Sequence, residues 1–139
     1  MTDDFELTAP AIIFPGMAQP ESAYRAAYDL LCRRFPREAL DLIEPALAAE
    51  PGNTGLRTLL AWAYLQRAQL GKAEEVLRGL IEVDPTDVWA QHALGRALER
   101  QSKYAEALPH LRLAAVMSDD WDHQAAAFRV ERRFQESAE

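Results

Sequence analysis

The densest grouping of metal-ligating side chains in this sequence is the stretch Asp-Asp-Trp-Asp-His at residues 119–123. Several carboxylates and an imidazole this close together could hold a divalent cation. The same carboxylates also suit the first turn of a helix, because their oxygens accept hydrogen bonds from free N–H groups and their charge suits the helix dipole. We favour this second interpretation, in which Asp119, Asp120 or Asp122 caps a helix and no metal binds.

Other residues with catalytic potential are isolated along the chain. His92, His110 and His123 do not show the spacing of four residues that places two imidazoles on one face of a helix. The sequence also has no glycine-rich phosphate loop, no cysteine pair with zinc spacing and no nucleophile elbow. The single cysteine, Cys32, precedes two arginines that could activate its thiol, but its apolar neighbours favour a packing role. We therefore predict no catalytic centre, metal or cofactor.

The composition indicates a globular, acidic protein. Of the 139 residues, 49% are hydrophobic and 27% are charged, and the formal net charge is −7. Such a chain lacks the clustered lysine and arginine that bind nucleic-acid phosphates, and an anionic membrane surface would not attract it. The longest apolar stretch, residues 9–18, is too short to span a bilayer and contains two prolines. With a lone cysteine and an acidic N-terminus, we expect a cytoplasmic protein with no nucleic-acid partner and no membrane insertion.

A repeat of 34 residues organises the chain. Pro51 and Pro85 are separated by this period, and the next step reaches Asp119. The same step links six columns of small or large apolar residues: Ala26, Leu60 and Leu94; Ala27, Ala61 and Gly95; Leu30, Tyr64 and Leu98; Ala39, Ala73 and Ala107; Ile43, Leu77 and Leu111; and Leu47, Ile81 and Ala115. A period of this length is typical of stacked structural units.

Each unit contains two stretches with helical spacing of apolar residues. In the second unit Gly71 lies between the two stretches, and Pro85 closes the unit because proline suits the start of a helix. No stretch alternates as a strand would. Pro45 and Pro109 fall inside predicted second helices, which we expect to bend around the core.

These columns resemble the tetratricopeptide repeat. The third unit matches through Leu94-Gly95, Tyr104, Ala107 and Leu111, and the second through Leu60-Ala61, Tyr64, Gly71, Ala73, Leu77 and Pro85. The resemblance implies an all-α, right-handed solenoid of three helix-turn-helix hairpins, in residues 20–53, 54–87 and 88–121. An extended segment, 1–19, precedes the hairpins, and a capping helix with its tail, 122–139, follows them. We expect the small residues Ala27, Ala61 and Gly95 to let paired helices approach closely.

The resemblance also implies a concave face, formed by the first helix of every unit, that holds a peptide. The repeat places the following residues there: Tyr24, Tyr28, Leu31, Cys32, Thr58, Trp62, Leu65, Gln66, Trp89, His92, Arg96, Glu99 and Arg100. Aromatic residues and arginine are frequent hot spots of binding. Packing between helices is an equal interpretation for Trp89, whereas we favour the groove for Trp62.

The residues of this face indicate which peptides it would hold. Tetratricopeptide adaptors that grip the acidic C-terminus of a chaperone use a clamp of lysine, asparagine and arginine. The corresponding positions here are Tyr24, Tyr28, Thr58, Leu59, Trp89 and Ala93, so that clamp is absent. We predict instead an extended or helical peptide with apolar anchors and an acidic residue near Arg96 and Arg100. In size and architecture the chain also resembles small secretion chaperones.

We therefore predict a non-catalytic module for protein–protein interaction, an adaptor or chaperone-like protein that binds a peptide segment of a partner. One alternative is a self-associating scaffold, a homo-oligomer in which segment 1–19 occupies the groove instead of strapping the first unit. A third class, a metal protein or enzyme built on residues 119–123 and His92, is the least favoured. For the terminal helix, capping is favoured over docking of a second copy.

Overall fold

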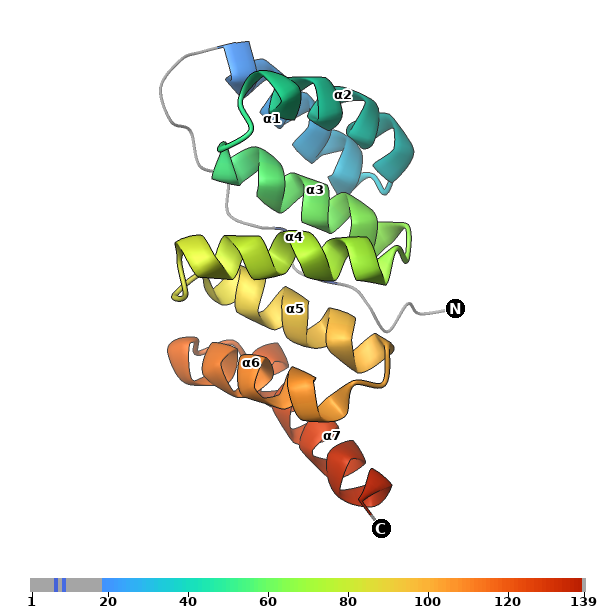
Figure 1. The fold of residues 1–139 in the computed structure, drawn as a ribbon, viewed down its shortest axis with the longest axis vertical. Helices are drawn as coiled ribbons and strands as arrows, with labels where there is room; N and C mark the ends of the chain where they lie inside the picture. The colour runs from blue at the N-terminus through green and yellow to red at the C-terminus, as the bar shows by residue number, and fades with distance from the viewer. Residues whose placement is uncertain (1–6, 8, 10–18, 139) are drawn as a thin grey trace. The chain divides into compact units, whose positions relative to one another are not determined.

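Seven α-helices make up most of the described chain (Figure 1). The computed structural model describes residues 7, 9 and 19–138, so nearly all of the predicted segment 1–19 lies outside it. The helices are α1 (Gln19–Cys32), α2 (Pro36–Ala49), α3 (Thr54–Gln66), α4 (Leu70–Val83), α5 (Val88–Arg100), α6 (Tyr104–Met117) and α7 (Trp121–Ser137). No described residue lies in a strand. The all-α prediction is confirmed.

The helix bounds follow the 34-residue period. The second helices of the three pairs begin at Pro36, Leu70 and Tyr104, and α3 and α5 begin at Thr54 and Val88. The predicted break at residues 101–103 separates α5 from α6. The terminal helix α7 begins one residue before the predicted position 122.

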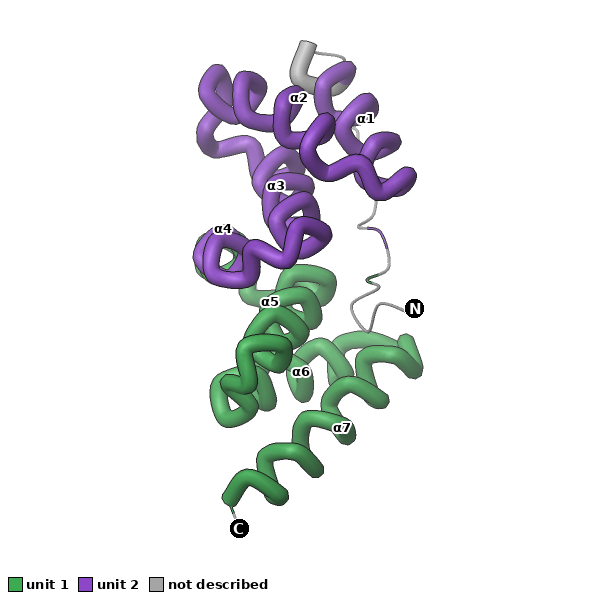
Figure 2. The backbone as a smooth tube through the Cα atoms, turned by 90° about the vertical axis from the view of Figure 1, so that its right-hand side faces the viewer, with its two compact units in different colours: residues 1–7, 77–139 green, residues 8–76 purple. Residues whose placement is uncertain are grey.

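Contacts between the helices divide the chain into two compact units (Figure 2). One comprises residues 8–76, in which α1, α2 and α3 pack against one another. The other comprises residues 77–139 with 1–7, in which α6 packs against both α5 and α7. The fully buried bulky residues are Leu31, Ile43, Leu56 and Leu59 in the first unit, and Leu77, Leu94, Leu98, Leu111 and Val130 in the second. Most of these come from the apolar columns of the repeat.

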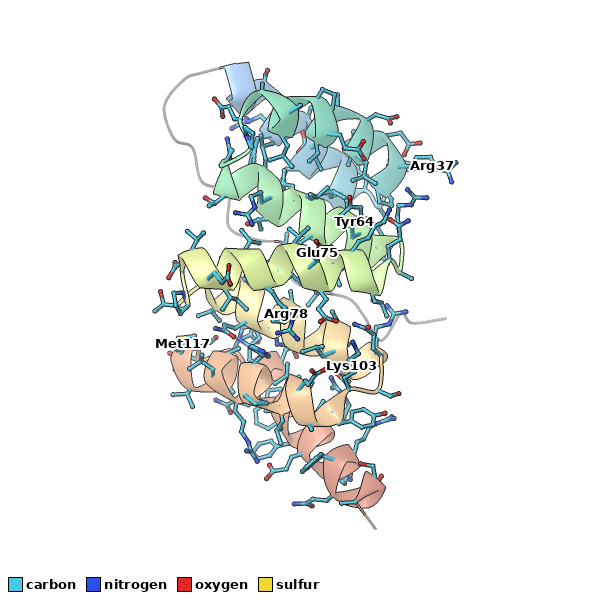
Figure 3. All side chains as sticks on the ribbon, viewed as in Figure 1. Arg37, Tyr64, Glu75, Arg78, Lys103 and Met117 are labelled. Carbon is cyan, nitrogen blue, oxygen red and sulfur yellow. The ribbon has the colours of Figure 1, made fainter. Side chains whose placement is uncertain are left out.

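A left-handed residue ends the first helix of each pair. Arg34, Ala68 and Ser102 have φ values of 64°, 57° and 60°, although none is glycine. The N–H of each donates to a carbonyl three residues back, and the next N–H donates to a carbonyl five residues back, at 2.8–3.0 Å. Lys103, which closes the third turn, is labelled in Figure 3. This is the Schellman motif, which turns the chain sharply at a helix end.

The position of the turn corrects the prediction for Gly71. Sequence spacing placed Gly71 between the two helices of the second unit, but it lies inside α4. Ala68 is the residue that reverses the chain, because the hydrogen bonds of the Schellman motif require its left-handed backbone. A glycine is favoured in that conformation but not required.

Side-chain caps begin the helices that follow the longer connections. Asn53, Asp87 and Asp120 accept hydrogen bonds from N–H groups at the starts of α3, α5 and α7, at 3.1, 3.1 and 2.9 Å. Of the three acidic residues proposed as caps of the terminal helix, Asp120 is the one that caps α7. Its hydrogen bond to the N–H of Asp122 accounts for this carboxylate without a metal.

Gly95 allows α5 and α6 to pack closely. A Cβ atom at this position would lie 2.4 Å from both Cγ and Cδ2 of Leu111. Ala27 and Ala61, in the same column, are fully buried. Pro45 and Pro109 lie inside α2 and α6 as predicted, on exposed positions where a lost backbone hydrogen bond can be replaced by water.

We predict that Ala68→Gly stabilises the protein by roughly 0.5–1 kcal/mol. The left-handed backbone costs a non-glycine residue about 1–2 kcal/mol, and the extra freedom of glycine in the unfolded chain offsets about half of that gain. Urea denaturation would measure the difference. The matched control is Ala26→Gly, at an exposed position inside α1, which should lose about 1 kcal/mol. A loss of stability at both positions would contradict the role of Ala68 in the turn.

A second prediction concerns Gly95→Ala. Although alanine is the better helix former by about 1 kcal/mol, the clash with Leu111 should make the variant less stable by roughly 1–3 kcal/mol. The free energy of unfolding of the double variant Gly95→Ala/Leu111→Ala tests the cause. It should fall by less than the sum of the two single changes, because the pair is in contact. Additive losses would show that the two residues do not clash.

Candidate functional site

The predicted binding residues lie in two groups, one in each compact unit. The group on α1 and α3 comprises Tyr24, Tyr28, Leu31, Thr58, Trp62, Leu65 and Gln66. The group on α5 comprises Trp89, His92, Arg96, Glu99 and Arg100. Their part in binding stays a prediction, and each group has its own geometry.

Three aromatic rings form a cluster on α1 and α3. The rings of Tyr24 and Tyr28 are stacked with centroids 6.2 Å apart, and Tyr28 meets Trp62 at 5.8 Å in a tilted arrangement. Tyr24 and Trp62 are 7% and 6% exposed, whereas Tyr28 is half-buried. Tyr28 therefore presents the accessible part of this aromatic cluster. Burial, and secondarily the nearby Cys32, raises the pKa of the Tyr28 hydroxyl, so the group stays protonated at neutral pH.

The other members of this group differ in what they offer to a partner. Leu31 and Leu65 are buried and support the face from within. Thr58 is half-buried, and its hydroxyl donates to the carbonyl of Thr54 in the same helix at 2.9 Å. Cys32 is exposed, so the packing role predicted for it is wrong: it is the last residue of α1, and its neighbour Leu31 takes the buried side.

Gln66 joins the C-terminal ends of α1 and α3. Its Nε2 donates to the carbonyl oxygen of Leu31 at 2.8 Å, which fixes the orientation of the amide. The Oε1 atom of the same amide is buried and has no hydrogen-bond partner among the described residues. A buried acceptor without a partner costs free energy, and its burial keeps a ligand from reaching it directly.

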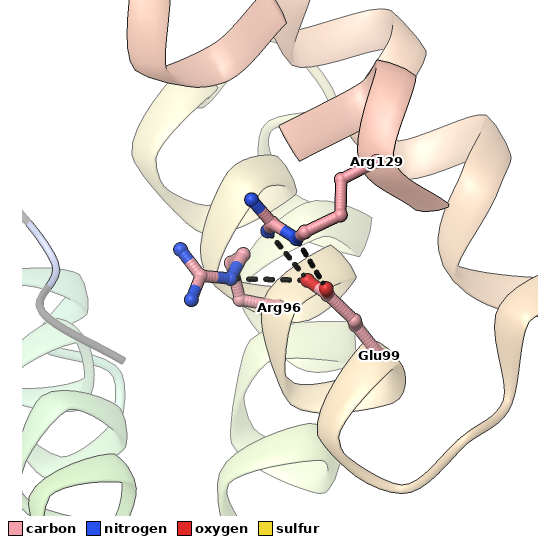
Figure 4. A network of polar contacts seen from close by, with 3 residues as sticks. All are labelled: Arg96, Glu99 and Arg129. Atoms are coloured by element: carbon pink, nitrogen blue, oxygen red, sulfur yellow. Dashed lines mark hydrogen bonds and ion pairs between the residues drawn. The ribbon is translucent and has the colours of Figure 1, made fainter. Parts of the chain in front are cut away.

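On α5 the main polar feature is a pair of arginines that share one carboxylate (Figure 4). Arg129 of α7 binds Glu99 with two hydrogen bonds, Nε to Oε2 at 2.6 Å and a terminal nitrogen to Oε1 at 2.8 Å. Arg96 Nε lies 3.1 Å from the same Oε1 atom. Arg100, on the same helix as Arg96 and Glu99, is exposed. The polar surface of α5 thus includes a side chain from α7.

His92 lies beneath α7. Its ring centroid is 4.3 Å from that of His123, its side chain is 6% exposed, and the Nδ1 atoms of both rings are buried without a partner among the described residues. Burial lowers the pKa of His92 to about 3, with smaller contributions from His123 and Arg96. The ring is therefore neutral at pH 7. Trp89, at the start of α5, is half-buried.

The partners of α5 could not be found from the repeat. Arg129 and His123 lie about 30 residues beyond Glu99 and His92, and only the packing of α7 brings them together. The one available signal was the row of arginines on the polar side of the terminal helix. Within the described part of the chain, no three histidine, cysteine, aspartate or glutamate side chains are grouped as metal ligands.

The fold is similar to that of several solved structures, and part of the sequence matches a known family model. Residues 36–98 match the family model of the tetratricopeptide repeat. The tetratricopeptide domain of Sgt2 from Aspergillus fumigatus has a TM-score of 0.79 and 21% identity, over 88% of this chain and 83% of that one. The first such domain of human RPAP3 has a TM-score of 0.76 and 16% identity, over 84% and 93%. Residues 36–98 thus match the tetratricopeptide repeat, and the described chain folds into three helix pairs followed by a seventh helix, as its sequence predicted.

A further similar structure is a complex. It is the first tetratricopeptide domain of Spaghetti (RPAP3) bound to the HSP90 peptide SRMEEVD, with a TM-score of 0.77 and 16% identity, over 84% of this chain and 96% of that one. No curated protein matches the sequence. None of the helices in the described part of the chain is both long and apolar enough to cross a membrane.

The buried state of His92 predicts a loss of stability in acid. A folded-state pKa near 3 lies below the value of about 6.5 for an exposed histidine, so protonation favours the unfolded chain. The contribution of His92 is fully present above pH 6.5 and is lost as the pH falls towards 3. We expect the free energy of unfolding to fall by roughly 2 kcal/mol from pH 7 to pH 5 on account of this group.

Urea denaturation at the two pH values would measure this effect in the wild type and in His92→Leu. The variant should lose much of the pH dependence, because the titrating group is gone. His110→Gln is the control. The ring of His110 is half-buried, so its removal should take away a smaller part of the pH dependence of the unfolding free energy. An unchanged pH dependence in His92→Leu would mean that His92 is not kept neutral by the fold.

Proposed function

We propose that this protein is a non-catalytic interaction module that binds a peptide segment of a partner protein. The observation that supports the proposal is the aromatic cluster on α1 and α3, in which the half-buried ring of Tyr28 packs against the buried Trp62. An apolar side chain of a peptide packed on the accessible part of the Tyr28 ring would anchor the ligand.

An acidic residue of the ligand near Arg96 and Arg100 stays a prediction from the sequence. Arg96 and Arg129 both contact Glu99, and Arg100 is exposed on the same helix as Arg96.

A chaperone C-terminus does not fit this surface well. Three of the last four residues of the HSP90 peptide SRMEEVD, which the Spaghetti domain binds, are acidic. At the positions where related adaptors carry clamp residues, Leu59 and Ala93 are fully buried and Tyr24 is 7% exposed. None of these three side chains supplies a cation. We therefore propose a ligand with internal apolar anchors. An adaptor or chaperone-like role and a cytoplasmic location stay predictions, as does the alternative in which segment 1–19 fills the groove.

The test begins with capture of a partner and mapping of the bound segment as a synthetic peptide. We expect Tyr28→Ala to weaken binding of that peptide by about 2 kcal/mol or more, a loss of roughly thirtyfold, because the accessible ring is the anchor point. Tyr28→Ala is a better choice than Trp62→Ala, since Trp62 is buried and its truncation would also damage the fold. Isothermal titration calorimetry would measure the affinity, and circular dichroism would confirm that each variant is folded.

Two further variants make the result specific. Arg100→Ala should weaken binding mainly at low salt, because exposed charges are screened. Glu75→Ala should have no effect, since Glu75 is exposed on α4 in the second helix of its pair (Figure 3). Unchanged affinity in a folded Tyr28→Ala variant would contradict the proposed face. Saturable binding of SRMEEVD would show that the ligand class is wrong while the interaction role stands.

A further inference from the structure

The outer face of α7 carries two exposed aromatic side chains. Its inner face, with Ala126, Ala127 and Val130, is buried in the second compact unit. On the opposite side Trp121 and Phe128 are 69% and 65% exposed. They are seven residues, or about two helical turns, apart, so both rings lie on one side of the helix. Two aligned, exposed aromatic rings on a helix face mark an interaction site more often than single exposed residues do.

The residues of this outer face have a symmetric spacing. We define the α7 outer face as Trp121, Ala125, Phe128 and Arg132, which follow one another at intervals of four, three and four residues. These are the intervals of a coiled-coil seam, and they read the same in both directions. When two copies of this face meet in antiparallel orientation, Trp121 lies opposite Arg132 and Ala125 lies opposite Phe128. A large side chain thus meets a small one, and an aromatic ring meets a guanidinium group.

The register of α7 also excludes a second helix packed as α6 packs on α5. Eight residues after the caps Asn53 and Asp87 stand Ala61 and Gly95, the small residues of the closely packed column. Eight residues after the cap Asp120 stands Phe128. A bulky ring occupies the position where close packing needs a small residue, so this face suits a looser, side-chain-mediated contact.

The charges along α7 favour a second copy in the antiparallel orientation. Its start is acidic, with three aspartates at residues 119–122, and Arg132 and Arg133 form a basic segment further along, whereas Arg129 and Glu131 are paired within the chain with Glu99 and Arg112. Antiparallel pairing brings the acidic start of each helix against the basic segment of the other, and it also opposes the two helix dipoles favourably. A parallel pairing would bring like charges together. A twofold axis repeats every favourable contact, as in most homodimers.

We propose that the α7 outer face is the interface of an antiparallel homodimer, with Phe128 packed against Ala125 and Trp121 against Arg132 of the second copy. The surface lies on α7 alone. The proposal does not depend on the peptide-binding face of α1 and α3, so either can fail without the other.

Sedimentation equilibrium of the full chain over about 1–500 µM would test the dimer. We expect the mass to rise from that of one chain to that of two, and we expect Phe128→Ala and Trp121→Ala each to raise the dissociation constant at least tenfold. Val83→Ala is the matched control: it removes an exposed apolar side chain of α4 and should change nothing. Circular dichroism would show that each variant keeps its helices.

A charge exchange tests the orientation. Arg132→Glu alone should weaken the dimer, because it places a carboxylate against the acidic start of the second copy. The double variant Asp122→Arg/Arg132→Glu should recover much of the loss. A single-chain mass up to 500 µM would overturn the proposal. So would a dimer that is insensitive to Trp121 and Phe128, or a double variant as weak as Arg132→Glu.

Discussion

The three helix pairs depend on one constraint, a sharp reversal of the chain at a left-handed residue. At Arg34, Ala68 and Ser102 the same backbone hydrogen bonds end one helix within three residues of the next. So short a turn requires the two helices to pack closely, and close packing requires a small residue in the first helix. Gly95 shows the limit, since not even a methyl group fits there against Leu111. The apolar columns follow from this geometry, because the residues around the contact must fill the space that it leaves.

Polar groups lie where the repeat ends or where its helices meet. The Arg96–Glu99–Arg129 network and the His92–His123 contact both join α5 to α7. Gln66 joins α1 to α3 through a main-chain carbonyl and leaves one buried oxygen unpaired. Polar side chains in such positions orient their helices when their hydrogen bonds are satisfied. The polar contacts of α5 therefore come partly from α7.

The seventh helix has two different sides. Its inner side completes the core of the second compact unit through Val130, and Arg129 of the same helix forms an ion pair with Glu99. Its outer side carries Trp121 and Phe128, which the core does not need. A helix that served only to cover the last unit would be expected to present a polar outer face to water. The combination of a buried inner side and an aromatic outer side is the physical basis for assigning it a second contact.

The sequence alone predicted the helices and their resemblance to the tetratricopeptide repeat, because a 34-residue period in apolar character shows which positions recur from one structural unit to the next. It also identified the capping role of the acidic stretch, since an N-cap is a local interaction. It wrongly placed the turn of the second unit at Gly71, because no residue type marks the left-handed backbone of Ala68. It also wrongly predicted a packing role for Cys32, because no residue type marks the exposed end of a helix. Only the tertiary structure paired Glu99 with Arg129 and His92 with His123, and it alone showed Trp62 to be buried while Tyr28 is accessible. Those contacts depend on how helices cross in space, and residues about 30 positions apart carry no mark of that in their own spacing.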